Sequence, residues 1–390
     1  MLLKKCCSYA LFLLPLSLLA GDPPVDGSTA DADGPHVFYR GKNIIVKSVE
    51  RYDTSVVART QIFSDKMQPV LTCRVPDMPA EFSFKLRKEF KEEPTEYTLP
   101  SRMLVLSDIE GDFKAFQMIL TGAKVIDDKY NWTFGKGHLV LVGDYFDRGL
   151  NVTECLWLIY KLETEAEAAG GKVHFILGNH EIMNIQGYTD YVRKKYFANA
   201  ELIGEPYKYW FDKHSELGRW LRSKNAVEKI GDYVFCHGGI SPEIATTRLS
   251  LSDINRISRE YIDVPYEKLK NEEARIVFDS KIGIFWYRAA AKNFIAPEEM
   301  EKVLQYAGAK HIVVGHTLQT DIVSLYDGGL ICIDLYHEEN VRRGFVKTLL
   351  VDNGTPYGVD SRGEKSSILQ IQTPRTVKGG VRVQESAGRN

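Results

Sequence analysis

The sequence has 390 residues, of which 44% are hydrophobic and 26% are charged, as in soluble globular proteins with one large domain or two ordinary ones. The formal net charge is only -2. This balance excludes the broad basic surface that nucleic-acid-binding and membrane-binding proteins use, so we expect no nucleic-acid partner, although a local basic patch such as Arg193–Lys195 remains.

The first twenty residues differ from the rest of the chain. Two lysines, Lys4 and Lys5, precede an apolar run from Ala10 to Ala20 that ends in small residues. This pattern predicts a secretory signal peptide, cleaved near Ala20 or Gly21. A membrane anchor is the alternative, but the run is shorter than the ~20 residues that a span needs. We therefore expect an exported protein, periplasmic or secreted, with no stable membrane insertion once the signal is removed.

The region after the predicted signal peptide (residues 1–20) contains a linker and then β-like runs. Residues 21–35 are rich in Asp, Gly, Pro, Ser and Ala, which predicts a flexible linker. Residues 36–100 hold short runs of β-forming residues, and we expect a β-rich N-terminal extension there. These runs are Val37–Tyr39, Asn43–Lys47, Pro69–Val75 and Phe82–Leu86. None of them carries a cluster of metal-ligating side chains.

Strands and helices alternate from Arg102 onward, which predicts an α/β fold with helices covering the faces of a sheet. Helices are expected at Phe113–Ala123, after a possible Asp112 cap, and at Thr153–Ala169. Two longer stretches also have helical spacing, Asp190–Lys229 and Ser241–Ala274. With further strands after Asn340, these elements make residues 101–372 the predicted catalytic domain, followed by a loose tail over residues 373–390.

Five apolar runs are each followed at once by polar side chains that can bind metal. They are Met103–Leu106 with Asp108, Glu110 and Asp112; Leu139–Val142 with Asp144, Asp147 and Arg148; Val173–Leu177 with Asn179, His180 and Glu181; Tyr233–Cys236 with His237; and His311–Val314 with His316. A polar turn after a core strand would explain one such junction. Five in series predict strand ends that meet at one edge of the sheet and form a shared metal site.

A two-metal site needs a bridging oxygen ligand and separate ligands for each ion. We predict Asp144 as the bridge. The other expected ligands are Asp108 and Glu110 for the first ion and Asn179, His237 and His316 for the second. Such a pair holds a hydroxide at neutral pH and clamps the oxygens of a phosphoryl group during direct in-line attack.

Three further residues complete the predicted chemistry. His180 follows a ligand directly, so it lies beside the metals and could protonate the leaving alkoxide. Asp147 could orient His180, although a simple turn residue is the alternative. Arg148 would bind the non-bridging phosphate oxygens. Supporting roles or helix caps are expected for Asp112, Glu181 and Thr317.

The polar blocks together resemble the calcineurin-like metallophosphoesterase superfamily. The blocks are Ser-Asp-Ile-Glu-Gly-Asp, Gly-Asp-Tyr-Phe-Asp-Arg-Gly, Gly-Asn-His-Glu, His-Gly-Gly and Gly-His-Thr. Arg148 points to the phosphoprotein phosphatase branch. The stretches Ile284–Arg288 and Val313–Gln319 are similar to the Shewanella-like protein phosphatases. The resemblance covers about Met103 to Asp334 and implies two facing β-sheets flanked by helices, with the metals at the sheet edges.

The resemblance also implies residue roles. Arg148 and Arg288 would hold the phosphate, although Arg288 could instead belong to ordinary packing around Trp286. His180 would be the proton donor. The implied ligands are Asp108, Asp144, Asn179, His237 and His316.

One departure from the family concerns the metals. The family has His in the first block where this chain has Glu110. A glutamate ligand would make the first site nearly all oxygen and would favour hard ions, manganese above all, with iron, zinc or magnesium as the other candidates. Alternatively, Glu110 points away and the first ion binds weakly.

The predicted function is therefore a hydrolase of phosphoric monoesters. Its substrate would be a phosphorylated protein, on serine, threonine or tyrosine, or a small phosphate ester. One alternative is hydrolysis of dinucleoside polyphosphates or phosphodiesters. A second, which only Glu110 favours, is a non-catalytic phosphate-binding protein on the same scaffold.

Overall fold

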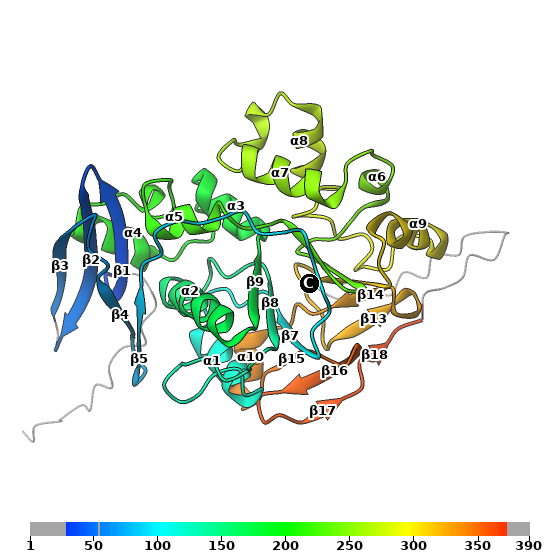
Figure 1. Ribbon diagram of the computed structural model, residues 1–390, viewed down its shortest axis with the longest axis horizontal. Helices are drawn as coiled ribbons and strands as arrows, with labels where there is room; N and C mark the ends of the chain where they lie inside the picture. The colour runs from blue at the N-terminus through cyan, green and yellow to red at the C-terminus, as the bar shows by residue number, and fades with distance from the viewer. Residues whose placement is uncertain (1–28, 54, 373–390) are drawn as a thin grey trace, which may run out of the picture.

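The computed structural model describes residues 29–53 and 55–372, and two facing β-sheets form its centre (Figure 1). The predicted signal peptide, the first part of the predicted linker and the predicted tail lie outside the described residues. The strands of the six-stranded sheet are, in spatial order, β17 (Lys365–Ser366), β16 (Thr355–Asp360), β15 (Lys347–Asp352), β7 (Arg102–Leu106), β8 (His138–Val142) and β9 (Lys172–Ile176). Those of the seven-stranded sheet are β18 (Leu369–Gln370), β13 (Val323–Leu325), β14 (Leu330–Cys332), β12 (His311–Val314), β11 (Tyr233–Cys236), β10 (Val227–Ile230) and β6 (Glu96–Tyr97).

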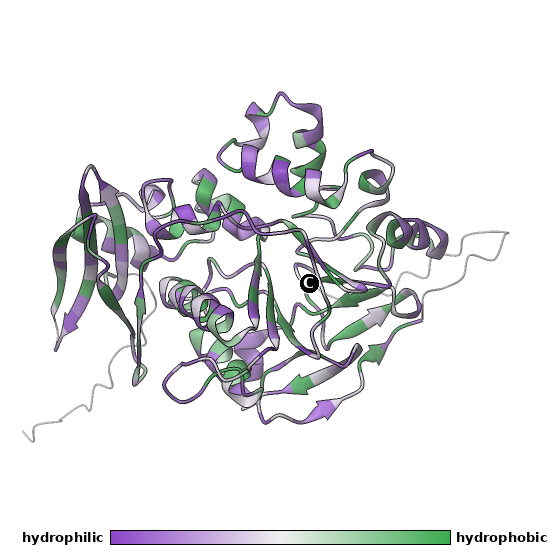
Figure 2. Cartoon of the chain, in the orientation of Figure 1, coloured by the Kyte–Doolittle hydropathy of each residue, from purple (hydrophilic) through white to green (hydrophobic). Residues whose placement is uncertain are grey.

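The alternation of side chains along each central strand explains why both faces of the six-stranded sheet are buried. In β7, Met103 and Val105 join an apolar cluster shared with strands of the other sheet, whereas Leu104 and Leu106 join the cluster that includes the helices. Successive side chains of a strand point to opposite faces, so a nearly continuous apolar run is what a doubly covered sheet requires. Figure 2 shows the central strands as mainly hydrophobic, in contrast to the helices α7 and α8.

Helices cover the outer faces of the two sheets. For two of these helices, the observed ends agree closely with the ends predicted from the sequence. Helix α1 (Phe113–Gly122) begins after Asp112, whose carboxylate accepts a hydrogen bond from Ala115 N at 2.9 Å, so the predicted cap is confirmed. Helix α2 (Val152–Ala169) ends at Gly170, which has a left-handed φ of 78°. The remaining helices are α3 (Asn179–Gln186), α4 (Lys194–Ile203), α5 (Glu216–Leu221), α6 (Pro242–Ala245), α7 (Leu251–Tyr261), α8 (Glu272–Val277), α9 (Pro297–Ala307) and α10 (His337–Arg342).

The N-terminal strands form a separate layer at one end of the molecule, shown in blue in Figure 1. Strands β1 (Asp33–Arg40), β2 (Asn43–Tyr52), β4 (Val70–Val75) and β5 (Ala80–Lys85) confirm the four predicted β runs, and β3 (Ser55–Ser64) was missed. The order β1-β2-β3 makes one sheet and β4-β5 a hairpin, and both pack against α2 or α4.

One sequence prediction was wrong in part. The predicted helical stretch 190–229 contains α4 and α5, but its last residues form β10 within the seven-stranded sheet, because Val227 is buried and pairs with Cys236 of β11. The predicted helical stretch 241–274 is confirmed, and Ser241 caps α6 by accepting a hydrogen bond from Ile244 N at 3.1 Å. Within the described residues, no helix has the length and apolarity to cross a bilayer.

Candidate metal centre and phosphate site

The five predicted strand ends meet at one edge because the strands that carry them are parallel neighbours. In the six-stranded sheet, β7 pairs with β8 and β8 with β9, all parallel; in the seven-stranded sheet, β11 pairs with β12 in the same way. The carboxyl ends of parallel strands lie at the same edge of their sheet. The structure therefore brings the predicted ligands of the two sheets face to face.

His237 Nε2 lies at the centre of the ligand set predicted for the second ion. It is 3.0 Å from Asp144 Oδ2, 3.0 Å from Asn179 Oδ1 and 3.2 Å from His316 Nδ1. All four side chains are buried. The Asp144 carboxylate, predicted as the bridge, thus lies next to the imidazoles and the amide that it was expected to meet.

Backbone carbonyls fix the protonation of the two imidazoles. His237 Nδ1 is 2.8 Å from Val142 O, and His316 Nε2 is 3.2 Å from Trp286 O. A carbonyl oxygen can only accept, so these nitrogens carry the protons in the neutral rings. The opposite nitrogens then present lone pairs to each other and to the oxygens of the other two side chains. Arg288 Nη2 lies 3.3 Å from His316 Nδ1 and can donate to it, but the acceptors around His237 Nε2 still need a proton or a metal ion among them, and the donor set therefore fits a metal ion.

The charges around this point also favour a cation. Burial opposes a charged ring, but the Asp144 carboxylate raises the pKa of His237 to about 9, so without a metal ion the ring holds a proton on Nε2 that faces Asp144, and a bound metal ion would take the place of that proton. Burial and the neighbouring His237 lower the pKa of His316 to about 2, which keeps that ring neutral, as a metal ligand must be. Burial likewise opposes ionisation of Asp144, yet the facing His237 and His180 hold its pKa below the ordinary value.

The ligands predicted for the first ion are arranged less closely. The Asp108 carboxylate accepts a hydrogen bond from His316 N, with Oδ2 at 3.1 Å, and lies beside the Gly315 backbone. Glu110 is about a quarter exposed and forms an ion pair with Arg148. Single ligand atoms of Glu110, Asp144 and His180 lie within 4.8 Å of one another. Glu110 is therefore turned toward the site, in a group that contains the predicted bridge.

His180 is held by a chain of hydrogen bonds. Its Nδ1 is 2.5 Å from Asp147 Oδ2, and its Nε2 is 3.8 Å from Asp144 Oδ2. Burial would lower its pKa, but Asp144 and Asp147 together raise it above the ordinary value, so the ring favours the protonated form. Asn184 donates to Asp147 Oδ1 at 3.0 Å, and Tyr207 donates to Asn184 Oδ1 at 2.7 Å. These two residues, which the sequence prediction missed, fix the carboxylate that orients His180.

Two arginines flank the metal-binding edge. The Arg148 side chain is 48% exposed and lies over the ring of Tyr191, 5.3 Å from its centroid. The Tyr191 ring is also 5.2 Å from the His180 ring, in a T-shaped arrangement. Arg288 is partly buried and donates a hydrogen bond to His316 O. Both predicted phosphate-binding residues thus lie next to predicted ligands or to the predicted proton donor.

The backbone of the strand ends is unusual. Six of the predicted site residues have positive φ values between 49° and 70°, namely Asp108, Glu110, Asp144, Asp147, Arg148 and His316. Non-glycine residues adopt this conformation at a cost and only where the surroundings hold it. Glu181 is one such support, since its buried carboxylate accepts hydrogen bonds from the backbone nitrogens of Gly178, Asp144 and Tyr145 at 2.7–2.9 Å. The supporting role expected for Glu181 is confirmed.

The sequence prediction missed one acidic residue at this edge. Strand β14 is the parallel neighbour of β12, with Cys332 opposite Val314, so Asp334 follows β14 as His316 follows β12. Its side chain is buried, and burial raises its pKa to about 6. The available signal was the apolar run Leu330–Ile333 directly before the aspartate, a sixth junction of the same kind.

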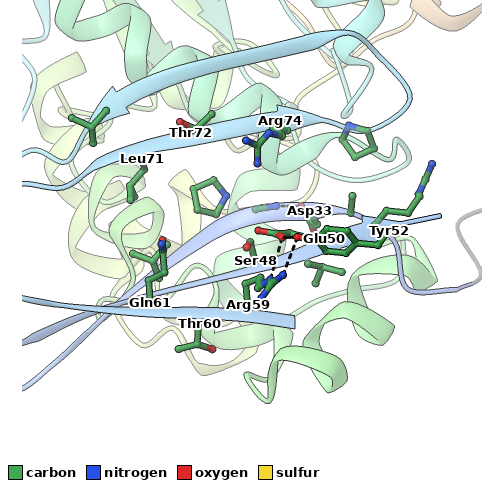
Figure 3. Close-up of a pocket in the computed structure, with 18 of the residues that line it drawn as sticks. Asp33, Ser48, Glu50, Tyr52, Arg59, Thr60, Gln61, Leu71, Thr72 and Arg74 are labelled. Atoms are coloured by element: carbon green, nitrogen blue, oxygen red, sulfur yellow. Dashed lines mark hydrogen bonds and ion pairs between the residues drawn. The ribbon is translucent and has the colours of Figure 1, made fainter. Parts of the chain in front are cut away.

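A large cavity lies far from this chemistry along the chain. It has a volume of about 930 Å3 and lies between the β1–β3 sheet and the β4–β5 hairpin (Figure 3). Its arginines are paired with carboxylates: Arg59 with Glu50 at 3.2 Å and Arg51 with Asp77 at 2.7 Å. Because its charges are balanced internally and the predicted site residues lie on other elements, we place the functional site at the strand ends.

Comparisons with known proteins identify the family. Residues 101–319 match the calcineurin-like phosphoesterase family. Shewanella-like protein phosphatase 1 of Plasmodium berghei is 30% identical over 230 residues, which are 56% of this chain and 61% of that protein. Shewanella-like protein phosphatase 2 of Arabidopsis thaliana is 38% identical over 113 residues, 29% of each protein. The chain thus spans less than two thirds of the length of these two relatives.

A solved structure is similar to this chain over a larger part of its length than these two relatives are. The cold-active protein-tyrosine phosphatase of a psychrophilic Shewanella species superposes with a TM-score of 0.77 at 31% identity, and the match covers 87% of this chain and 100% of that one. The predicted architecture of facing sheets flanked by helices is confirmed by this match and by the sheet order. Since the family match covers more than half of its residues, the chain belongs to the calcineurin-like phosphoesterase family, a family of phosphoric-ester hydrolases.

Proposed function

We propose that this protein is a metal-dependent phosphomonoesterase that removes phosphate from phosphorylated proteins, phosphotyrosine among them. The observation that carries the proposal is the meeting of four buried ligand atoms, from Asp144, Asn179, His237 and His316, beside an imidazole that a carboxylate holds. The Shewanella protein-tyrosine phosphatase, matched over its whole length, supports a phosphoprotein substrate.

The residues present fit two metal ions that share Asp144. One ion would be held with Asn179, His237 and His316, and the other with Asp108 and Glu110. When bound, the ions would supply Lewis acidity that activates water and offsets the charge on the phosphoryl oxygens. The oxygen-rich first set favours a hard ion such as manganese.

The protein itself binds the phosphate and supplies a proton. Arg148 and Arg288 would bind the non-bridging oxygens, and two guanidinium groups suit the dianion of a monoester better than the single charge of a diester. Because Asp147 holds Nδ1 of His180, the proton on Nε2 is available to the leaving-group oxygen.

The test compares para-nitrophenyl phosphate with bis(para-nitrophenyl) phosphate, phosphotyrosine and phosphoserine peptides and a dinucleoside polyphosphate, each with manganese, magnesium, iron or zinc. We expect the monoesters to be hydrolysed faster than the diester and the dinucleotide. A higher rate on either of the latter would overturn the proposal. So would a manganese-purified protein that holds less than one ion and turns over none of the substrates, since this fits a binding protein.

A further inference from the structure

A second cavity, of about 440 Å3, lies beside the strand ends that carry the metal site. We call it the flanking pocket. One wall is the segment after β12, and the other is the segment after β14 together with α10. The residues that matter here are Leu318, Gln319, Tyr336, Glu339, Asn340 and Arg343.

The flanking pocket is lined by residues that closely follow His316 and Asp334 in the chain. Leu318 is two residues beyond His316, and Tyr336 is two residues beyond Asp334. Gln319 N donates a hydrogen bond to Asp334 O at 2.9 Å, so the two segments run side by side. Two residues of extended chain span at most about 7 Å. The pocket therefore begins within that distance of a predicted metal ligand.

The mouth of the flanking pocket is apolar and open to solvent. The Leu318 side chain is 59% exposed and Tyr336 is 56% exposed. The charges on the α10 side are paired, since Arg343 Nε lies 3.1 Å from Glu339 Oε1. A neutral pocket with exposed apolar side chains at its rim suits an apolar group better than a charged one.

Helix α10 is fixed to the same strand ends. His337, in its first turn, is buried, and its Nε2 is 3.1 Å from Ser107 O, the residue before Asp108. Helix α10 also packs against α1 (Figure 1). The α10 wall of the pocket therefore has a fixed position relative to the predicted ligands of the first ion.

On the basis of the phosphatase function proposed above, we infer that the flanking pocket binds an apolar side chain one or two residues from the phosphorylated residue of a polypeptide substrate. Successive Cα atoms of a peptide are about 3.8 Å apart, so a residue at that separation reaches the pocket while the phosphate lies at the metals. A small phosphate ester such as para-nitrophenyl phosphate has no second side chain beside its phosphorylated group to occupy the pocket. The pocket therefore selects proteins over small esters, and apolar over charged flanking residues.

The experiment measures kcat/KM for phosphotyrosine peptides with Leu, Ala or Asp at each of the two positions before and after the phosphorylated residue. Para-nitrophenyl phosphate, assayed on the same preparation, is the reference for each variant. At one or more positions, we expect a Leu peptide to exceed its Ala counterpart by about tenfold, the usual discrimination of a hydrophobic pocket. L318A and Y336A should remove most of this preference, and Y336F should keep it. Ile62→Ala, an exposed apolar residue on β3, is the matched control and should leave the preference unchanged.

Equal rates on Leu, Ala and Asp peptides in the unaltered protein, or a preference that survives both L318A and Y336A, would overturn the inference. A protein that does not hydrolyse para-nitrophenyl phosphate with any metal would overturn the proposed function instead. In that case, binding of fluorescent phosphopeptides, measured by anisotropy, still tests the pocket, because the Leu-over-Ala preference and its loss in L318A and Y336A do not depend on turnover.

Discussion

Two clusters of buried polar and charged residues among those that the structure describes can be compared, and one of the two has the features of a catalytic centre. The catalytic cluster contains Asp144, Asn179, His180, His237 and His316. The N-terminal cluster, where β1 packs on α2 and α4, contains Asp33, His36, Glu154, Lys195 and Asn199, each at most 4% exposed. Burial and charge alone therefore do not distinguish a site from a structural contact.

The two clusters differ in how their donors and acceptors match. In the N-terminal cluster, Asn199 donates to Asp33 Oδ2 at 3.1 Å, and Lys195 donates to Leu150 O at 2.7 Å. In the catalytic cluster, the Asp144 and Asn179 oxygens and His316 Nδ1 all face His237 Nε2, so that these acceptors need a proton or a metal ion among them, and the backbone there has positive φ values. A mismatch that a cation would relieve, held by a strained backbone, is the better indicator of function.

The largest expected difference between the two clusters comes from removing the carboxylate of Asp144, which both predicted metal ions would share. D144N keeps the shape of the side chain but removes the charge that both ions would share. We expect activity to fall by more than about 10³-fold, because this carboxylate would hold both of the ions that activate water and offset the charge on the phosphoryl oxygens. Metal content and kcat on para-nitrophenyl phosphate check this. Asp33→Asn in the N-terminal cluster is the control, and per folded molecule it should retain activity; a similar loss in both variants would mean that the clusters do not differ in function.

The next largest effect concerns His180, which we predict to donate a proton to the leaving group without serving as a metal ligand. H180N should lower kcat by about 10²- to 10⁴-fold, the range for a lost general acid, with both metals still bound. The loss should be larger for phenyl phosphate than for para-nitrophenyl phosphate, because para-nitrophenolate leaves without needing a proton. An equal loss on both esters would show that His180 is not the proton donor, and the release of both ions would show that it acts as a ligand.

The catalytic cluster could be predicted from the sequence because each part of it is local. An apolar run such as Leu139–Val142 and the aspartate that follows it lie within a few residues of each other. Asp334 escaped prediction because its strand, Leu330–Cys332, has only three residues and gives a weak pattern. The Glu110–Arg148 ion pair joins turns after two different strands, and no local pattern contains it. The packing of β1 on α2 and α4 is likewise non-local.

The two predicted ion sites differ in their ligands, and a change at Glu110, which belongs to the first of them, tests that difference. E110H restores the residue that the family has in this block and removes the carboxylate partner of Arg148. We expect the ratio of zinc to manganese bound at equilibrium to rise about tenfold, since imidazole suits softer ions than a carboxylate does. Elemental analysis after dialysis against both metals measures the ratio, and E110Q separates loss of charge from gain of imidazole. An unchanged ratio in E110H would mean that Glu110 is not a ligand.

The smallest expected effect lies in the N-terminal cluster and concerns Glu154, which like His36 Nε2 lacks a hydrogen-bond partner there in the part of the chain that the structure describes. Within the described residues, both of its carboxylate oxygens are buried without a hydrogen-bond partner, and burial raises its pKa to about 8 from an ordinary value of 4.5. Below the ordinary value, the group is protonated whether the chain is folded or unfolded. Between the two values, unfolding releases its proton, so the free energy of unfolding falls as the pH rises, and the loss is complete above the folded pKa.

E154Q removes this pH dependence, because a glutamine side chain does not titrate. It should stabilise the protein by on the order of 1–3 kcal/mol at about pH 9 and by much less at about pH 5. Melting temperatures at the two pH values measure the difference, and Glu167→Gln on the exposed face of α2 is the matched control. An equal gain at both pH values would show that the ionised carboxylate is not what destabilises this cluster. A loss of activity in E154Q would show that the N-terminal cluster also contributes to catalysis, so the two clusters would not differ in function.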